Sequence, residues 1–123
     1  MSTDSLVLAI IGHLVGDYLL QNDWMAMEKK RNPMVALLHS MMWSMSVMMF
    51  SGWGGIHGWH GVEIFGYLNT SHFFQDHTMI VHRWMKLIGQ DAFAKPPLAP
   101  WSVIVVDNVW HIVTLWAVWR WIA

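Results

Sequence analysis

The sequence predicts an all-α protein, a four-helix transmembrane bundle with a polar His/Asp site in its cytoplasmic half. Three observations support this fold class. The chain of 123 residues is 55% hydrophobic and 12% charged, against about 25% charged residues in an ordinary soluble domain. Its apolar residues gather in four segments. Each segment carries at least one histidine, and in three of them an aspartate lies four residues away from it.

The length is enough for one domain, so residues 1–123 are expected to form a single integral membrane domain. The first helix is expected over about residues 5–21, an apolar run that a polar stretch ends. The second is expected over 33–51, because Asn32 and Pro33 are typical of an N-cap and a first helical position. The helices predicted in the second half cover about residues 62–89 and 101–122.

The third segment, 62–89, carries many polar residues. It is expected to be either one long tilted helix or a helix broken near residues 69–71. The glycine-rich stretch 52–61, which also contains two tryptophans, is expected to be a loop at a membrane surface. Residues 94–100 hold three of the four prolines and must form a loop, after which 101–122 forms the last span.

Basic residues predict the orientation, because cytoplasmic loops carry an excess of lysine and arginine. Six of the seven lie near the two loops that would share one side, and only Arg120 lies at the opposite ends. We therefore expect a multi-pass protein of the inner (cytoplasmic) membrane with both termini outside. The ten tryptophans are expected to form an interfacial belt.

The polar residues inside the four segments share spacing and depth. A histidine and an aspartate four residues apart project from one face of a helix, and an ionisable group in a membrane helix is costly enough to indicate function. With a rise of ~1.5 Å per residue, these groups lie roughly 6 to 21 Å from the cytoplasmic helix ends, so they are expected to meet. The candidate metal ligands are His13, Asp17, His39, His72, Asp76, Asp107 and His111.

Carboxylate and imidazole ligands favour a divalent metal such as Zn, Mn or Fe. Seven ligands would suit two ions, or one ion supported by further Asp–His pairs. The chain has no cysteine, which excludes thiolate sites. A bound ion could activate water for hydrolysis, with Asp17 and Asp107 as the candidate catalytic residues that bind the ion and hold a proton.

A second set of residues is expected to bind substrate. Amide side chains could orient it, and basic side chains at the cytoplasmic interface could attract an anionic, phosphorylated, lipid-like molecule. His57 and His60 are expected on the opposite side, and His77 and His82 on other faces of the third segment. The candidate substrate-binding residues are Gln21, Asn69, Asn108, Lys29, Lys30, Arg83 and Lys86.

With these residues in view, the chain resembles a family of small bacterial and phage membrane proteins classed as a domain of unknown function. The matching motifs are Gly12-His13-Leu14-x-x-Asp17-Tyr18-Leu19-Leu20-Gln21, Trp24-Met25, Lys29 or Lys30, His39, His72-x-x-x-Asp76 and Asp107-Asn108-x-x-His111. The family commonly has Gln where this chain has Asn108. The pattern is also distantly similar to membrane-bound metal-dependent hydrolases, which implies a hydrolase by analogy.

Other functions stay open at this point. A chain of protonatable groups could carry protons or metal across the membrane, but only Glu63, His57 and His60 continue the path outward. Axial haem ligands need no aspartate four residues away, so the pattern argues against haem. A structural or interaction protein with a metal-stabilised bundle, alone or in a homo-oligomer or larger membrane assembly, would use the same residues. A net charge of −1 gives no case for nucleic acid.

Overall fold

The computed structural model describes residues 2–123, whose regular elements are all helical. This confirms the all-α class, because the described residues contain no strand. A π-helical turn and a 3₁₀ turn accompany six α-helices. In chain order the elements are α1 (Thr3–Leu14), η1 (Val15–Leu19), α2 (Asp23–Glu28), α3 (Pro33–Ser51), η2 (Trp53–Gly55), α4 (Trp59–His77), α5 (Ile80–Leu87) and α6 (Trp101–Trp121).

Two predicted helices, α3 and α6, have the expected bounds. At the start of α3, the Asn32 side chain accepts a hydrogen bond of 2.9 Å from the Met34 amide, and Pro33 occupies the first turn. At its end, Gly52 adopts a left-handed conformation with φ 75°, which a glycine reaches without strain. These are local signals, so the sequence alone places both ends of α3.

The first segment is less regular than predicted. α1 gives way at Leu14 to the π-helical turn η1, where Leu20 donates to the Val15 carbonyl across 3.0 Å. Such turns often occur at functional sites, and Asp17 lies within this one. The unpredicted helix α2 follows, capped by Asn22, whose side chain accepts from the Met25 amide.

The third segment breaks at a different place from either expectation. α4 runs unbroken through residues 69–71, and the chain leaves the helix at Thr78 and Met79 before α5. Asn69 does not interrupt α4, because its side chain accepts a hydrogen bond of 2.7 Å from Ser40 on α3. The polar residue is therefore satisfied by a neighbouring helix.

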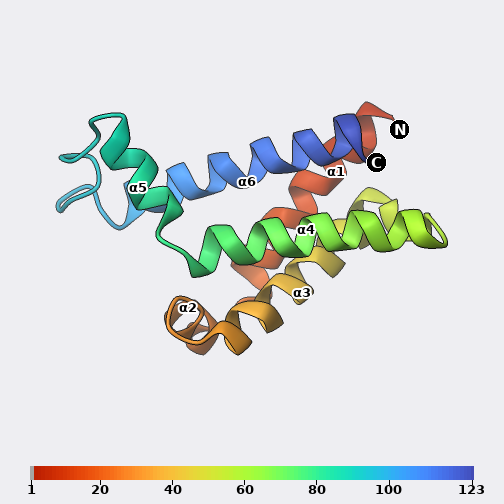
Figure 1. Cartoon of the computed structure of the whole chain (residues 1–123), viewed down its shortest axis with the longest axis horizontal. Helices are drawn as coiled ribbons and strands as arrows, with labels where there is room; N and C mark the ends of the chain where they lie inside the picture. Colours follow the sequence, from red (N-terminus) through yellow and green to blue (C-terminus); the bar gives the residue numbers. More distant parts are fainter. Residues whose placement is uncertain (1) are drawn as a thin grey trace.

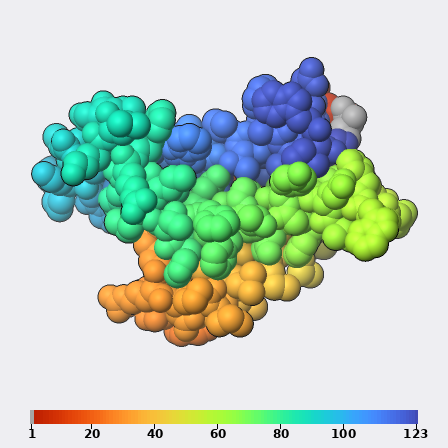
Figure 2. Space-filling model, in the orientation of Figure 1, coloured from red at the N-terminus to blue at the C-terminus, as the bar shows by residue number. Residues whose placement is uncertain are grey.

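The long helices form a bundle (Figure 1). α4 and α6 lie alongside each other, α1 and α3 cross beneath and behind them, and both termini lie at one end. The Trp119 indole donates to the Ser2 carbonyl across 3.2 Å and holds the termini together. α2 and α5 lie toward the opposite end. In the space-filling view, α2 and the start of α3 (orange) cover one side of α4 (Figure 2).

The core is apolar at the end that holds the termini. Trp53, expected in a loop at the membrane surface, is fully buried here, and α4 begins at Trp59, three residues earlier than predicted. Toward the other end of the bundle the buried residues become polar. The apolar cluster consists of Ala9, Trp43, Val47, Trp53, Ile64, Leu68, Leu115 and Val118.

Of the described helices, two are long and apolar enough to cross a membrane, namely α3 and α6, rather than the four that the sequence predicted. α1 has 12 residues before the π-helical turn, and α4 holds Glu63, Asn69 and Asp76 within 19 residues. The polar residues that build the internal cluster lower the apolar character of the helices that carry them.

Candidate metal centre

Two glycines bring α1 against α3 and so deliver Asp17 to the cluster. A Cβ atom on Gly12 would lie 2.8 Å from the Ser46 carbonyl oxygen and from the Val47 Cα. A Cβ on Gly16 would lie 2.9 Å from the Trp43 ring. Small residues four apart allow such close helix packing. This spacing was not among the sequence predictions, although it is visible in the chain itself.

Four side chains from three segments converge on one point. They are Asp17 on η1, His39 on α3, and His72 and Asp76 on α4. His39 Nε2 lies 3.0 Å from His72 Nε2, 3.2 Å from Asp17 Oδ1 and 3.1 Å from Asp76 Oδ2. His72 Nε2 lies 3.4 Å from Asp17 Oδ1 and 3.2 Å from Asp76 Oδ2.

These separations match the edges of a metal coordination shell. Ligands bound at about 2.1 Å lie about 3.4 Å apart around a tetrahedral ion and about 3.0 Å apart at adjacent octahedral positions. Five of the six distances between the four atoms fall between 3.0 and 3.4 Å. The residues therefore fit a divalent ion such as zinc or manganese.

Hydrogen bonds alone do not explain the convergence. A hydrogen bond between two polar atoms needs a proton, and an imidazole Nε2 supplies at most one. The Nε2 atoms of His39 and His72 make five close contacts, one with each other and four with the carboxylates of Asp17 and Asp76. At most two imidazole protons are available for these five contacts. A cation at the centre would satisfy all four atoms at once.

A second group lies beside the first and shares Asp76 with it. Asp76, Asp107 and His111 each offer one donor atom, and these atoms lie within 4.8 Å of one another. His111 Nδ1 donates to the Asp107 carbonyl across 2.8 Å, which leaves Nε2 without a proton. His111 Nε2 is buried without a hydrogen-bond partner and lies 3.7 Å from Asp76 Oδ1.

The structure places His13 next to these groups, with both ring nitrogens engaged. Trp43 Nε1 donates to His13 Nδ1 across 3.0 Å, and His13 Nε2 lies 2.9 Å from Asn108 Oδ1. Because an indole can only donate, Nδ1 must accept and Nε2–H must donate. Trp43 also stacks on His72, with ring centroids 4.1 Å apart. The sequence analysis gave Trp43 no role, yet it orients two histidines.

The carboxylates of the cluster outnumber the ammonium groups around it. Asp17, Asp76 and Asp107 face Lys29, whose Nζ lies 2.6 Å from Asp76 Oδ2, and Lys30, which lines the same cavity. With neutral imidazoles the formal charge is −1. Asp76 is 3% exposed, and buried carboxylates without compensation are costly. A divalent ion would supply the missing positive charge.

The turn after α2 is fixed to the C-terminal end of α4. Lys30 donates to the Asp76 carbonyl across 2.9 Å, and the His77 ring nitrogen Nδ1 lies 2.8 Å from the Lys29 carbonyl oxygen. His77 is thus on a different face of α4 from the candidate metal ligands His72 and Asp76, as predicted. These contacts hold both lysines at the rim of the cluster.

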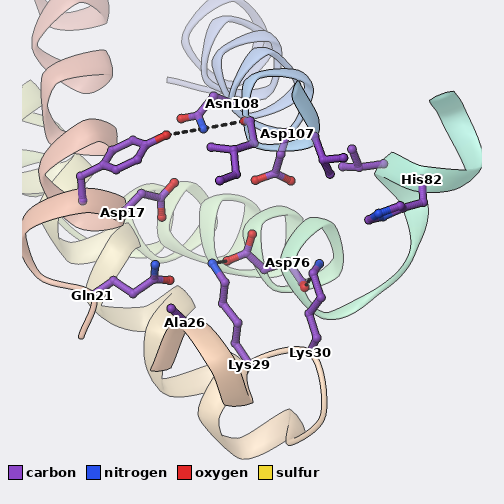
Figure 3. Close-up of a pocket in the computed structure, with 13 residues that line it drawn as sticks. Asp17, Gln21, Ala26, Lys29, Lys30, Asp76, His82, Asp107 and Asn108 are labelled. Carbon is purple, nitrogen blue, oxygen red and sulfur yellow. Dashed lines mark hydrogen bonds and ion pairs between the residues drawn. The ribbon is translucent and has the colours of Figure 1, made fainter. Parts of the chain in front are cut away.

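A cavity of roughly 260 Å³ opens beside the cluster. Figure 3 shows the carboxylates of Asp17, Asp76 and Asp107 around it, with the Lys29 ammonium against Asp76 and Lys30 nearby. Asp107, 24% exposed, is the most accessible of the three carboxylates.

The structure brings some of the predicted substrate residues to this cavity and leaves others away from it. Arg83 and Lys86 are exposed on α5, and Asn69 is paired with Ser40, so none of the three lines the cavity. His82, expected on another face, does line it. Those that line the cavity are Gln21, Lys29, Lys30 and Asn108.

Asn108 and Gln21 differ in how much of their hydrogen-bonding capacity is free. Asn108 uses its amide group on Tyr18, Ile104 and His13. Gln21 Oε1 is buried without a hydrogen-bond partner. Gln21 is therefore the amide that has an acceptor to offer a ligand.

The comparisons with known proteins give one match. The sequence model of a family described as "Protein of unknown function (DUF3307)" matches residues 5–123. No curated protein and no solved structure matches the chain. The predicted resemblance to a family of unknown function is confirmed, while the similarity to hydrolases and a phage origin stay predictions.

Proposed function

We propose that this chain, which belongs to the DUF3307 family, is a membrane-embedded metal-dependent hydrolase. It would act on an anionic, phosphorylated, lipid-like substrate at the cytoplasmic interface. The observation that carries the proposal is the convergence of Asp17, His39, His72 and Asp76 beside a cavity walled by Lys29 and Lys30.

The outward faces of the two long helices support insertion into a bilayer. Exposed apolar side chains form a row along each of them, and such extended apolar surfaces are rare on soluble monomers. In the most apolar stretch of α6 only 22% of the residues are buried inside the protein, whereas the core helix of a soluble protein is mostly buried. The rows are Met34, Leu38, Met41, Met45 and Met49 on α3, and Trp101, Val105, Val109, Val113 and Trp116 on α6.

Four spans with both termini outside fit the same arrangement. The π-helical turn extends α1, so that α1 and η1 together cover 17 residues, close to the roughly 20 that a span needs. α4 has 19 residues. Lys29, Lys30 and Arg31 follow α2, and Arg83 and Lys86 lie on α5, away from the termini. The positive-inside rule puts that end in the cytoplasm.

The residues around the cavity suit hydrolysis of a phosphate ester. An ion in the cluster would polarise a water molecule and a phosphoryl oxygen. Asp107, at the cavity wall, would accept a proton from that water, whose oxygen forms the new bond to phosphorus. The ester P–O bond then breaks, and the leaving oxygen takes the proton back from Asp107. Lys29 and Lys30 would attract the phosphate charge.

The apolar core argues against a transport path. Beyond the polar cluster, toward the termini, the bundle is filled by Val47, Trp53, Ile64, Leu68 and Leu115. Water or ions would have to cross this packed layer to leave on the other side. A site closed at one end and open through a cavity at the other is what an enzyme acting at one interface needs.

Lipid profiles of cells that express the protein test this function. Wild type should deplete a phosphorylated lipid and enrich the corresponding alcohol, while Asp17→Asn and Asp107→Asn should leave both at control levels. His57→Gln changes an exposed loop histidine away from the cluster and should behave as wild type. Identical profiles for all variants, with metal content intact, would contradict hydrolysis and favour a structural or interaction role.

A further inference from the structure

We propose that a second divalent ion binds between Asp76, Asp107 and His111, and that Asp76 bridges the two ions. The proposal rests on the metal centre of the proposed function and extends it to a two-ion site.

The unpartnered nitrogen of His111 is the main observation. His111 is 1% exposed, and its Nδ1–H is committed to the Asp107 carbonyl. The lone pair of Nε2 therefore points into a buried space with no donor to meet it. Metal-bound histidines commonly have this arrangement, with one nitrogen hydrogen-bonded to a carbonyl and the other on the ion.

The two oxygens of Asp76 face different neighbours. Oδ2 lies 3.1 Å from His39 Nε2 and 3.2 Å from His72 Nε2, in the first group. Oδ1 lies 3.7 Å from His111 Nε2, in the second. A carboxylate that gives one oxygen to each ion would set them roughly 3.5–4 Å apart, the usual spacing of two-metal hydrolytic sites.

Both positions border the cavity. Asp17 of the first group, Asp107 of the second and the shared Asp76 line it, whereas His111 does not and closes the second position on its buried side. Three protein ligands leave coordination positions open toward Lys29 and Lys30, where water and a phosphoryl oxygen could bind. Asp107 would give one oxygen to the ion and keep the other for the proton.

The charge of a two-ion centre points to the substrate class. Two divalent ions and the ammonium groups of Lys29 and Lys30 against three carboxylates leave a formal charge of +3, with neutral imidazoles. A phosphate monoester carries close to two negative charges at neutral pH and would compensate most of this charge, whereas a diester carries one. We therefore infer a lipid-like phosphate monoester as the substrate class.

Manganese titration of the full-length protein in detergent, followed by electron paramagnetic resonance, tests the second site. Wild type should bind two Mn²⁺ and give the spectrum of a spin-coupled pair at the second equivalent. His111→Gln and Asp107→Asn should each bind one Mn²⁺ and give no coupled signal. His57→Gln should match wild type. Inorganic phosphate should perturb the coupled spectrum of wild type.

Two results would overturn the second site: saturation of wild type at one Mn²⁺, or coupled pairs in both variants. Asp107→Asn is nearly isosteric at a partly exposed position, so it decides the matter if His111→Gln does not fold. Binding of a single ion together with lipid hydrolysis would contradict the second site and support the proposed function. Two coupled ions without any change in the lipid profile would support the second site and contradict the proposed function.

Discussion

His39 and His72 bring their Nε2 atoms within 3.0 Å of each other, although they lie on different helices and 33 residues apart in sequence. Both nitrogens also face the carboxylates of Asp17 and Asp76 at 3.4 Å or less. The two imidazoles supply at most two protons for these five close contacts, so the arrangement favours a cation between the four atoms.

The topology gives the first prediction. The chain has no cysteine, so single cysteines can be labelled without background. Arg31→Cys, in the turn after α2, should react only from the cytoplasmic side, because its loop is basic. Ser2→Cys and His57→Cys should react only from outside. Labelling of all three from one side would rule out the proposed arrangement.

The close approach of α1 and α3 gives the second prediction. Gly12→Ala places a Cβ 2.8 Å from backbone atoms of Ser46 and Val47. Overpacking of this kind costs about 1–3 kcal/mol, and it should also weaken metal binding by moving Asp17 away from His39. Thermal unfolding in detergent measures the loss of stability.

Gly66 provides the matched control, because a Cβ there would meet no atom within 4 Å. Gly66→Ala, within α4, should raise stability by up to about 1 kcal/mol. Equal unfolding temperatures for Gly12→Ala and Gly66→Ala would show that the glycines do not set the helix distance.

The indole of Trp43 gives the third prediction. Trp43→Phe keeps an aromatic ring against His72 but removes the donor to His13 Nδ1. A buried acceptor left unpaired costs about 1–3 kcal/mol, so the free energy of unfolding should fall by that amount while the metal content is retained. Trp119→Phe removes a similar bond at the exposed end of the bundle and should cost less than ~1 kcal/mol. A variant Trp43→Phe as stable as wild type would disprove the role given to this bond.

The position of Lys29 gives the fourth prediction. Its ammonium lies on Asp76 Oδ2, the oxygen that the first ion would use. Lys29→Met should therefore bind Mn²⁺ about tenfold more tightly, because a competing positive charge is gone. The comparison is Lys30→Met, since Lys30 contacts the Asp76 carbonyl rather than its carboxylate. Calorimetric titration measures both, and weaker binding to Lys29→Met than to Lys30→Met would contradict this competition.

The sequence predicted features that depend on neighbours along the chain. Asn32 and Pro33 start α3, and Gly52 ends it, through local backbone preferences. The His/Asp spacing in three segments put each pair on one helical face, so the cluster itself could be expected. The π-helical turn and the break at Thr78 depend on packing between helices and left no clear local pattern.

Partners that are distant in sequence were harder to foresee. Nothing in the spacing says that Trp43 donates to His13, or that Asn69 pairs with Ser40. The same limit explains the substrate residues. Charge alone put Arg83 at the site, whereas the direction of α5 brings the neighbouring His82 to the cavity instead.

Anomalous diffraction from crystals of the protein grown with Mn²⁺ or Zn²⁺ is the most direct test of the metal centre. A peak is expected about 2.0–2.3 Å from Asp17 Oδ1, His39 Nε2, His72 Nε2 and Asp76 Oδ2. A cluster with unchanged distances and no anomalous peak among these four atoms, at a metal concentration that saturates binding in solution, would contradict it.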